Sequence, residues 1–323
     1  MSLLNIQNLY TRFATDQGTI NAVNGVSFRL EEGEILGLVG ESGSGKSVTA
    51  LSVMGLISKP PGKVTADEMS FDGSDLLRLT ESQAREIRGS KLAMIFQDPM
   101  RSLNPVLTIG RQITEVLHRH LKLDSKIARR RAIELLEMVG IPLAEKRLGA
   151  YPHHFSGGMR QRVMIAIALS CNPKLIIADE ATTALDVTIQ AQIIDLVKKL
   201  SKEHGTAVIW ISHDLGVVAS LCDRVNVMYA GEIVESAPIR EIFRRPCHGY
   251  THGLIGSTPR VDGVNLQRLI PIEGIPPNMI DPITLCSFLP RCRLSTAECK
   301  TTQPLPRNFG DNHWASCLAN LSS

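Results

Sequence analysis

A glycine-rich stretch, Gly40-Glu41-Ser42-Gly43-Ser44-Gly45-Lys46-Ser47, has the residue types and the spacing of a phosphate-binding P-loop. The apolar run before it, 35–39, predicts a buried strand, and the apolar stretch after it, 47–57, predicts a helix. Glycines let such a loop approach a ligand, so that backbone N–H groups meet phosphate oxygens at the positive end of the helix. We expect Lys46 to reach the β- and γ-phosphates and the Ser47 hydroxyl to bind Mg²⁺. The stretch therefore predicts a nucleoside triphosphate site rather than a Gly/Ser turn.

Two carboxylates, Asp179 and Glu180, follow an apolar run at 175–178 that predicts another buried strand. Successive side chains of a strand point to opposite faces, so the two acids are expected to have different roles. We expect Asp179 to hold Mg²⁺, directly or through water, and Glu180 to polarise the water that attacks the γ-phosphate. Paired acids are weak evidence alone, but after a P-loop in an α/β chain they predict hydrolysis.

Two further segments place polar groups beside predicted elements. Ser156-Gly157-Gly158 precedes an apolar helix at 159–170, and small residues at a helix N-terminus favour an anion site, although a plain helix cap has the same pattern. His213 follows a predicted strand at 206–211, at the sheet edge where ligands bind in open α/β sheets. A lone histidine is usually structural, but this position predicts a place at the nucleotide site.

Strands that alternate with helices indicate an α/β fold with a mostly parallel sheet, and polar–apolar alternation in 20–30 adds an antiparallel edge. Helical periodicity between about 100 and 171 indicates an inserted helical subdomain. We therefore predict a nucleotide-binding domain at 1–256 and a proline-rich, loop-rich C-terminal extension at 257–323. The other predicted strands are 3–10, 91–96 and 225–229, and the other helical segments are 109–121, 127–139, 187–202, 215–221 and 238–245.

The composition excludes several classes of protein. Of 323 residues, 43% are hydrophobic and 21% charged, as in a folded soluble protein, and 4% are aromatic, too few for a base-stacking platform. The net charge of +3 does not indicate a nucleic-acid or membrane surface, and we interpret the arginines at 129–131 as a solvated helix face. No run of about 18 apolar residues and no signal peptide is present, so a cytosolic, reducing setting is expected.

The order of these motifs resembles that of the ATP-binding subunits of ATP-binding cassette (ABC) transporters over residues 1 to about 255. In that comparison Gln97 is the Q-loop glutamine, 156–160 is the signature, Ala184-Leu185-Asp186 is the D-loop and His213 is the switch histidine. The signature carries Met159 where the family commonly has glutamine. The resemblance implies a P-loop ATPase that uses ATP and Mg²⁺, with Gln97 joining Ser47 and Asp179 around the metal.

Three segments narrow the resemblance to dipeptide and oligopeptide permease ATPases. They are the Q-loop region 95–105 and the tail segments 249–251 and 288–292. This branch implies uptake of peptides across the bacterial inner membrane. The alternatives are another cargo of the same transporters, such as nickel, glutathione or antimicrobial peptides, a soluble ABC ATPase outside transport, or a subunit that binds ATP without hydrolysis.

Four cysteines gather in the tail, Cys286, Cys292, Cys299 and Cys317. Their spacing is wider than the paired cysteines of structural zinc sites, and an iron–sulfur cluster tolerates varied spacing, so the pattern leaves a cluster, zinc and free thiols open. The resemblance favours a [4Fe–4S] cluster, because some peptide-permease ATPases carry one on this pattern.

The resemblance also implies an assembly. Two ATPase subunits would sandwich ATP between the P-loop of one and Ser156, Gly157, Gly158 and Asp186 of the other. The family often pairs two different chains, and we expect a different chain here. Two transmembrane permeases and an extracytoplasmic binding protein are the implied partners, with this chain peripheral on the cytoplasmic face and no nucleic acid bound. Phe13, or else Tyr10, is expected to stack on adenine.

Overall fold

The computed structural model describes residues 2–182, 185–257, 271–280, 283–310 and 312–319. The chain forms two compact units. The first consists of Met1–Leu3, Leu30–Ile35 and Arg78–Ile211, and the second of Leu4–Arg29, Leu36–Leu77 and Ser212–Ser323.

The first unit contains a parallel ladder and a group of helices. Strands β7 (Leu92–Ile95), β8 (Leu175–Asp179) and β9 (Ala207–Ser212) are parallel neighbours, and nearly every residue in them is buried. Such continuous apolar runs form strands that are covered on both faces. The helices are α2 (Glu81–Ile87), α3 (Pro99–Ser102), α4 (Ile109–Leu121), α5 (Ser125–Met138), α6 (Ala144–Arg147), α7 (Gly157–Leu169) and α8 (Val187–His204), with a 3₁₀ turn η1 (Pro152–His154).

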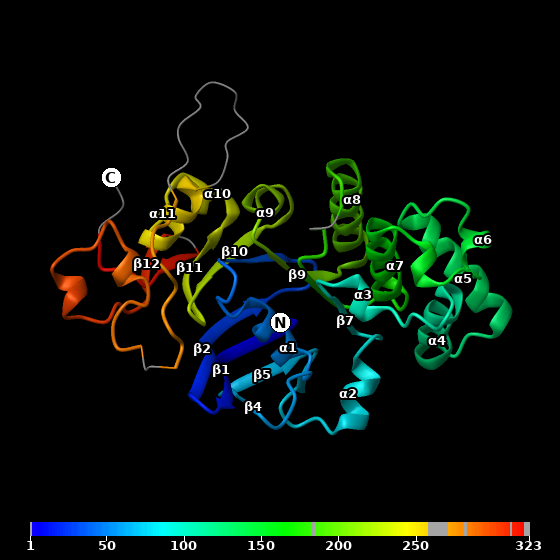
Figure 1. Ribbon diagram of the computed structural model, residues 1–323, viewed down its shortest axis with the longest axis horizontal. Helices are drawn as coiled ribbons and strands as arrows, with labels where there is room; N and C mark the ends of the chain where they lie inside the picture. The colour runs from blue at the N-terminus through cyan, green and yellow to red at the C-terminus, as the bar shows by residue number, and fades with distance from the viewer. Residues whose placement is uncertain (1, 183–184, 258–270, 281–282, 311, 320–323) are drawn as a thin grey trace. The chain divides into compact units, whose positions relative to one another are not determined.

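Helices α4, α5 and α7 pack on one another, as the green part of Figure 1 shows. Their contact is apolar because residues such as Ile113, Leu117 and Leu135 recur at helical spacing and are fully buried. The helices that the periodicity of this stretch predicts are therefore confirmed.

The second unit begins with an antiparallel sheet. Strands β1 (Leu4–Thr15) and β2 (Gly18–Leu30) are joined by β4 (Gly62–Thr65), β5 (Glu68–Phe71) and β6 (Ser74–Asp75), in the order β2-β1-β5-β6 with β4 also on β1. The half-buried alternation in β2 is confirmed as a strand at the edge of this sheet. Strands β4 to β6 were not predicted, because runs of four residues or fewer show no period.

A second ladder of this unit carries the P-loop. It has the order β12-β13-β11-β10-β3, from β3 (Ile35–Val39), β10 (Arg224–Tyr229), β11 (Glu232–Pro238), β13 (His313–Ala315) and β12 (Arg307–Gly310). Strand β10 is parallel to β3, and the other neighbours are antiparallel. The helices are α1 (Lys46–Val53), α9 (Leu215–Leu221), α10 (Ile239–Arg244) and α11 (Gly249–Gly256), with 3₁₀ turns η2 (Leu289–Arg291) and η3 (Glu298–Lys300).

The C-terminal region contributes strands β12 and β13 to this ladder. Trp314 and Ala315 of β13 pair with Ser236 and Glu235 of β11. The tail is rich in loops as predicted, but this strand pairing was not foreseen, because three residues carry no usable pattern. Among the described residues, no helix combines the length and the apolar character that crossing a bilayer requires.

Candidate nucleotide site

The P-loop lies between the buried strand β3 and helix α1 in the second unit, as the sequence predicts. Gly40 has φ +154°, and a Cβ there would lie 2.2 Å from the carbonyl oxygen of Met228. Gly45 has φ +99°, and its Cβ would lie 2.5 Å from the carbonyl oxygen of Ala22. Any larger residue would therefore displace the loop at both positions. A Cβ at Gly43 would meet nothing, because it faces open space.

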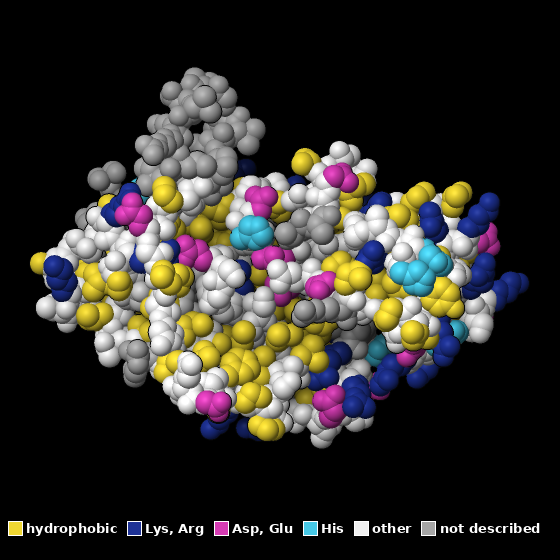
Figure 2. All heavy atoms as spheres, viewed as in Figure 1, with side chains coloured by type: hydrophobic (Ala, Val, Ile, Leu, Met, Phe, Trp, Pro, Cys, Tyr) yellow, Lys and Arg dark blue, Asp and Glu magenta, His cyan; other side chains and the backbone are white. Residues whose placement is uncertain are grey.

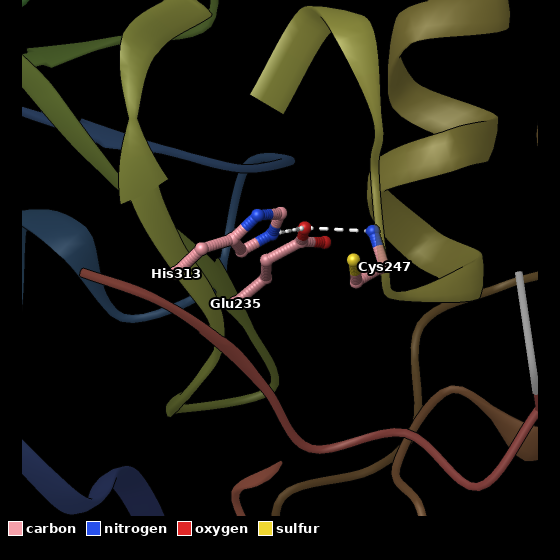
Figure 3. A group of neighbouring side chains, drawn as sticks. All are labelled: Glu235, Cys247 and His313. Carbon is pink, nitrogen blue, oxygen red and sulfur yellow. Dashed lines mark hydrogen bonds and ion pairs between the residues drawn. The ribbon is translucent and has the colours of Figure 1, made fainter. Parts of the chain in front are cut away.

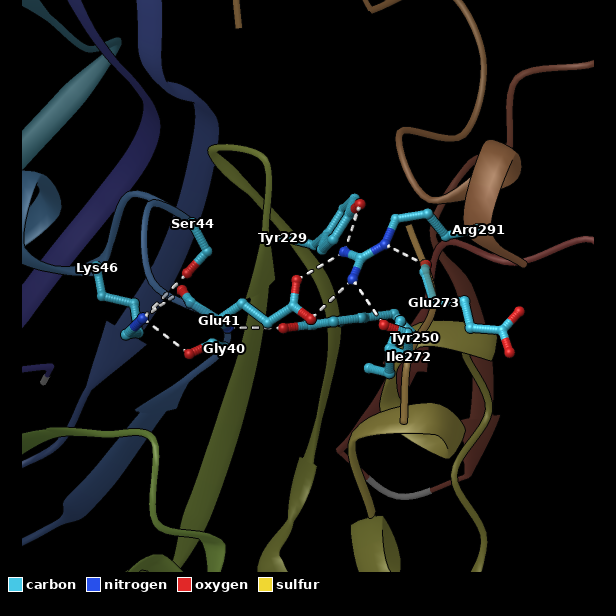
Figure 4. A network of polar contacts seen from close by, with 9 residues as sticks. All are labelled: Gly40, Glu41, Ser44, Lys46, Tyr229, Tyr250, Ile272, Glu273 and Arg291. Carbon is cyan, nitrogen blue, oxygen red and sulfur yellow. Dashed lines mark hydrogen bonds and ion pairs between the residues drawn. The ribbon is translucent and has the colours of Figure 1, made fainter. Parts of the chain in front are cut away.

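Lys46 reaches back across the loop. Its Nζ donates hydrogen bonds to the carbonyl oxygens of Gly40, at 2.9 Å, and Glu41, at 2.8 Å, and to Ser44 Oγ at 3.2 Å (Figure 4). The side chain is only 6% exposed, so its ammonium is held inside the curve of the loop. Convergent backbone N–H groups, a fixed cation and the N-terminus of α1 together can bind phosphate.

The strand-end carboxylates and Gln97 belong to the first unit. Asp179 ends β8 and is 5% exposed, and Glu180 follows it with φ +48°. A non-glycine residue in this region stores backbone strain of about 1–3 kcal/mol, which recurs at functional positions. The Glu180 N–H donates to the carbonyl oxygen of Ile211 at 3.0 Å, which holds that conformation.

The structure brings two predicted site residues together directly. The side-chain amide Nε2 of Gln97 donates to Oε2 of Glu180 at 2.7 Å. Gln97 is exposed and Glu180 half-buried, so both face accessible space. The contact fixes one carboxylate oxygen and orients the acid.

The other first-unit residues cap helices. Ser156 is the N-cap of α7, where its Oγ accepts the N–H of Met159 at 3.3 Å. Asp186 caps α8 and accepts the N–H of Ile189 at 2.9 Å. Gly157 and Gly158 form the first turn of α7, with Gly157 exposed. The helix cap considered for Ser156 is confirmed, and the cap at Asp186 was not predicted; the role of both residues in a partner's nucleotide site stays a prediction. Of the predicted D-loop, Ala184 lies outside the described residues.

His213, Phe13 and Tyr10 belong to the second unit. His213 is exposed at the junction of β9 and α9. Phe13 lies half-buried on β1 opposite Gly62, whose Cβ would be 3.1 Å from the ring. Tyr10 has the Arg12 guanidinium over its ring, 5.0 Å from the centroid. Both aromatic rings therefore pack on the antiparallel sheet, and their role toward adenine stays a prediction.

The four tail cysteines line one pocket, together with Phe288, Leu289 and Leu318. Burial, with a smaller contribution from the nearby Cys317 and Cys292, raises the pKa of the Cys286 thiol to about 11. Burial also raises the pKa of Cys292 and Cys317. Within the described part of the chain, no three of these sulfurs lie within 4.8 Å of one another. Four thiolates on one zinc ion would stand about 3.8 Å apart, from Zn–S bonds of about 2.3 Å, so the four sulfurs are not arranged here as the ligands of one zinc ion.

A buried polar cluster was missed from the sequence. The Glu235 carboxylate, which is fully buried, accepts the backbone N–H of Cys247 at 2.7 Å, that of His248 at 2.9 Å and Nε2–H of His313 at 2.8 Å (Figure 3). These three donors account for the buried charge, and they attach the 247–248 turn and β13 to β11. Glu235, Cys247 and His313 also have metal-ligand chemistry, but the hydrogen bonds explain the arrangement. Residues 78 positions apart leave no sequence signal.

The arginine triplet of α5 is paired with acidic side chains. Arg129 contacts Glu145, and Arg130 and Arg131 contact Glu134. Figure 2 shows Lys and Arg side chains on the surface of α4 to α6 interspersed with acidic ones. This mixture is that of a solvated helix face.

Comparison with known proteins identifies the family of the chain and its fold. The ABC transporter family matches residues 23–183, and the C-terminal region of oligopeptide/dipeptide transporters matches residues 234–299. A solved dimeric structure of the ATP-binding cassette MJ0796, bound to ADP and Pi, has a TM-score of 0.66 and 30% identity and covers 73% of this chain and 99% of its own. The fold is therefore that of an ATP-binding cassette, as predicted.

Named relatives match most of the chain. The oligopeptide transport ATP-binding protein OppD of Bacillus subtilis is 54% identical over 87% of this chain and 78% of its own. The dipeptide transport ATP-binding protein DppD of Bacillus subtilis is 50% identical over 98% and 94%. OppD of Haemophilus influenzae is 49% identical over 97% of each chain. With the motifs in place, the chain belongs to the ATP-binding proteins of ABC transporters, in the oligopeptide/dipeptide branch.

Proposed function

We propose that this chain is the ATP-hydrolysing subunit of an importer that takes up dipeptides or oligopeptides across the bacterial inner membrane. The observation that carries the proposal is the presence, in one chain, of a formed P-loop and the C-terminal region of oligopeptide/dipeptide transporters. The named relatives act in oligopeptide and dipeptide transport, which supports the cargo.

In this proposal the P-loop residues 40–47 bind the triphosphate of ATP. Lys46 exchanges its contacts with the Gly40 and Glu41 carbonyls for the β- and γ-phosphates, where its charge balances the oxygens. Ser47, Gln97 and Asp179 hold Mg²⁺, which neutralises charge on the phosphates during transfer.

Glu180 is the general base and Gln97 orients it. The hydrogen bond between them orients the Glu180 carboxylate, which accepts a proton from the attacking water. Gln97 would hold Mg²⁺ through its side-chain carbonyl oxygen, and a turn of the amide toward the metal would release Glu180, so this residue would link metal binding to the orientation of the base. His213 holds the γ-phosphate and the water at the end of β9.

The assembly follows the same proposal. A second ATPase subunit, which the resemblance favours as a different chain, completes the site, so that each P-loop faces Ser156, Gly157, Gly158 and Asp186 of its partner. Two permeases cross the membrane, a binding protein delivers the peptide, and this chain lies on the cytoplasmic face. The dimeric form of the MJ0796 cassette supports the pairing.

We further propose that Cys286, Cys292, Cys299 and Cys317 bind a [4Fe–4S] cluster. All four line one mostly apolar pocket. A [4Fe–4S] cluster is held by four cysteine thiolates, one on each iron, so the number of cysteines matches. The raised pKa values of the thiols mean that a bound cation is required to keep them as thiolates.

The proposed function is tested by identifying the proteins that copurify with this chain and by measuring peptide uptake. Tagged protein is purified from detergent-solubilised membranes, and its copurifying chains are identified. Two multi-span proteins and a second ATPase are expected, and vesicles holding that complex should take up labelled dipeptide with ATP. Uptake of nickel or glutathione but not peptide would contradict the peptide cargo. An active ATPase recovered without membrane partners would contradict transport itself.

A further inference from the structure

Arg291 of the C-terminal region forms an ion pair with the P-loop. Its two terminal nitrogens contact the two carboxylate oxygens of Glu41, at 2.6 Å and 3.0 Å (Figure 4). The Arg291 side chain is 5% exposed and that of Glu41 28% exposed. A planar guanidinium that meets a carboxylate through two parallel hydrogen bonds fixes both position and orientation.

Arg291 is itself held in place on every side. Its Nε donates to the Glu273 carbonyl oxygen at 2.9 Å, and Nη1 donates to the Tyr229 hydroxyl at 3.1 Å. The guanidinium also lies 5.8 Å from the ring centroid of Tyr229 and 5.9 Å from that of Phe288. The hydrogen bond to Glu41 raises the pKa of Arg291 above its usual value, so the group is permanently charged. A cation fixed in this way is preorganised for its partner.

The same loop residue is held through its backbone. The Glu41 N–H donates to the hydroxyl of Tyr250, which is fully buried in α11, at 2.7 Å. Tyr229 and Tyr250 are in ring contact, with centroids 4.6 Å apart. Both the side chain and the backbone of Glu41 are therefore fixed by residues that follow position 228 in the sequence.

A carboxylate in a loop that binds a triphosphate opposes that binding, because like charges repel at short range. We propose that Arg291 is a positioning residue for nucleotide binding, which neutralises the Glu41 carboxylate and holds the P-loop in shape from the C-terminal region. The inference rests on the proposed role of the P-loop as the ATP site. It gives the C-terminal region a direct part in ATP affinity.

The test compares two arginines of the same segment in the full-length chain. Arg293 forms an exposed ion pair with Glu273, at 2.7 Å, and is the matched control. ATP affinity is measured by titration calorimetry and folding by thermal unfolding. We expect Arg291→Ala to raise the Kd for ATP about tenfold, which corresponds to about 1.4 kcal/mol, and Arg293→Ala to leave it within about twofold.

A rescue variant separates the charge from general damage. Glu41→Gln in the Arg291→Ala background removes the unpaired carboxylate, so it should lower the Kd again by about threefold or more. If Arg291→Ala does not fold, Arg291→Lys replaces it, since lysine keeps the charge but cannot make the two-nitrogen contact. That variant should raise the Kd about threefold.

A folded Arg291→Ala or Arg291→Lys protein with unchanged Kd would overturn the inference, as would an equal loss in Arg293→Ala. A failure of the proposed ATP-binding role of the P-loop would give a different result. If the wild-type chain binds no ATP, or if Lys46→Ala binds it as tightly as wild type, the proposed role of the P-loop is wrong irrespective of Arg291.

Discussion

The contiguous motifs and the four-cysteine pocket are two different kinds of site. The P-loop comes from one stretch between β3 and α1, and Asp179 and Glu180 come from the end of one strand. The pocket instead gathers cysteines from a segment with few regular elements, residues 286–317. A site from one stretch forms when its local elements form, whereas the pocket depends on several turns closing together.

The largest effect is expected at the strand-end acid. Glu180→Gln should lower ATP turnover about 10³-fold, because an amide cannot accept the proton of the attacking water. ATP binding should stay within about threefold, since the charge on the phosphates is met elsewhere. Turnover in the assembled transporter and Kd are measured together. Normal turnover would remove the general-base role of Glu180.

The next largest effect is expected at the P-loop lysine, Lys46. Lys46→Ala should lower turnover about 10²-fold and weaken ATP binding, because it removes a fixed cation from the phosphate site. Lys63→Ala, an exposed lysine of β4, is the control and should change neither quantity. Equal behaviour of the two variants would mean that the loop does not bind phosphate.

The pocket is probed by removing one cysteine. Cys292→Ser should abolish iron and sulfide in anaerobically purified protein and lower the melting temperature by several degrees, because a bound metal holds the turns together. Cys171 is half-buried, follows α7 by two residues and is not among the residues that line the pocket, so Cys171→Ser should retain both the iron and the sulfide. Wild-type protein that is colourless and free of iron would refute the cluster, and zinc in its place would identify the other metal.

The smallest effect is expected on how the free energy of unfolding depends on pH. Burial raises the pKa of Glu232, which lies near Cys286 on the wall of a neighbouring cavity, from 4.5 to about 7. The folded protein thus binds a proton that the unfolded chain has lost, so this group's stabilising contribution falls as pH rises from about 4.5 to 7. Glu232→Gln should remove that slope and be more stable than wild type at pH 8.

Denaturant unfolding at pH 5 and pH 8 measures the difference. Glu203→Gln, an exposed change on α8, is the control and should follow the wild type at both values. A Glu232→Gln protein that loses stability at pH 8 would show that the buried carboxylate is stabilising instead.

The features that the sequence predicted correctly depend on residues that are close together along the chain. Gly40 and Gly45 were assigned to a loop that needs unusual backbone geometry, and both have positive φ with no room for a side chain. The strands with continuous apolar runs, such as β8, and the long helices, such as α4, also followed from local pattern.

What the sequence could not predict depends on distant partners. Glu41 meets Arg291 across 250 positions, and Glu235 meets His313 across 78. Nothing near either residue identifies its partner, because any charged side chain is by default solvated. Helix caps such as Asp186 were predicted for another role, since capping and anion binding use the same residue types.

The division of the chain into two units has a consequence for its synthesis. The first unit is almost entirely one uninterrupted stretch, Arg78–Ile211, which can begin to fold as soon as the ribosome has released it. The second unit combines Leu4–Arg29 and Leu36–Leu77 with Ser212–Ser323, so its early strands wait for the last third of the chain. The P-loop is made early but acquires its partner Arg291 near the end of translation, so a truncated product would carry the loop without its support.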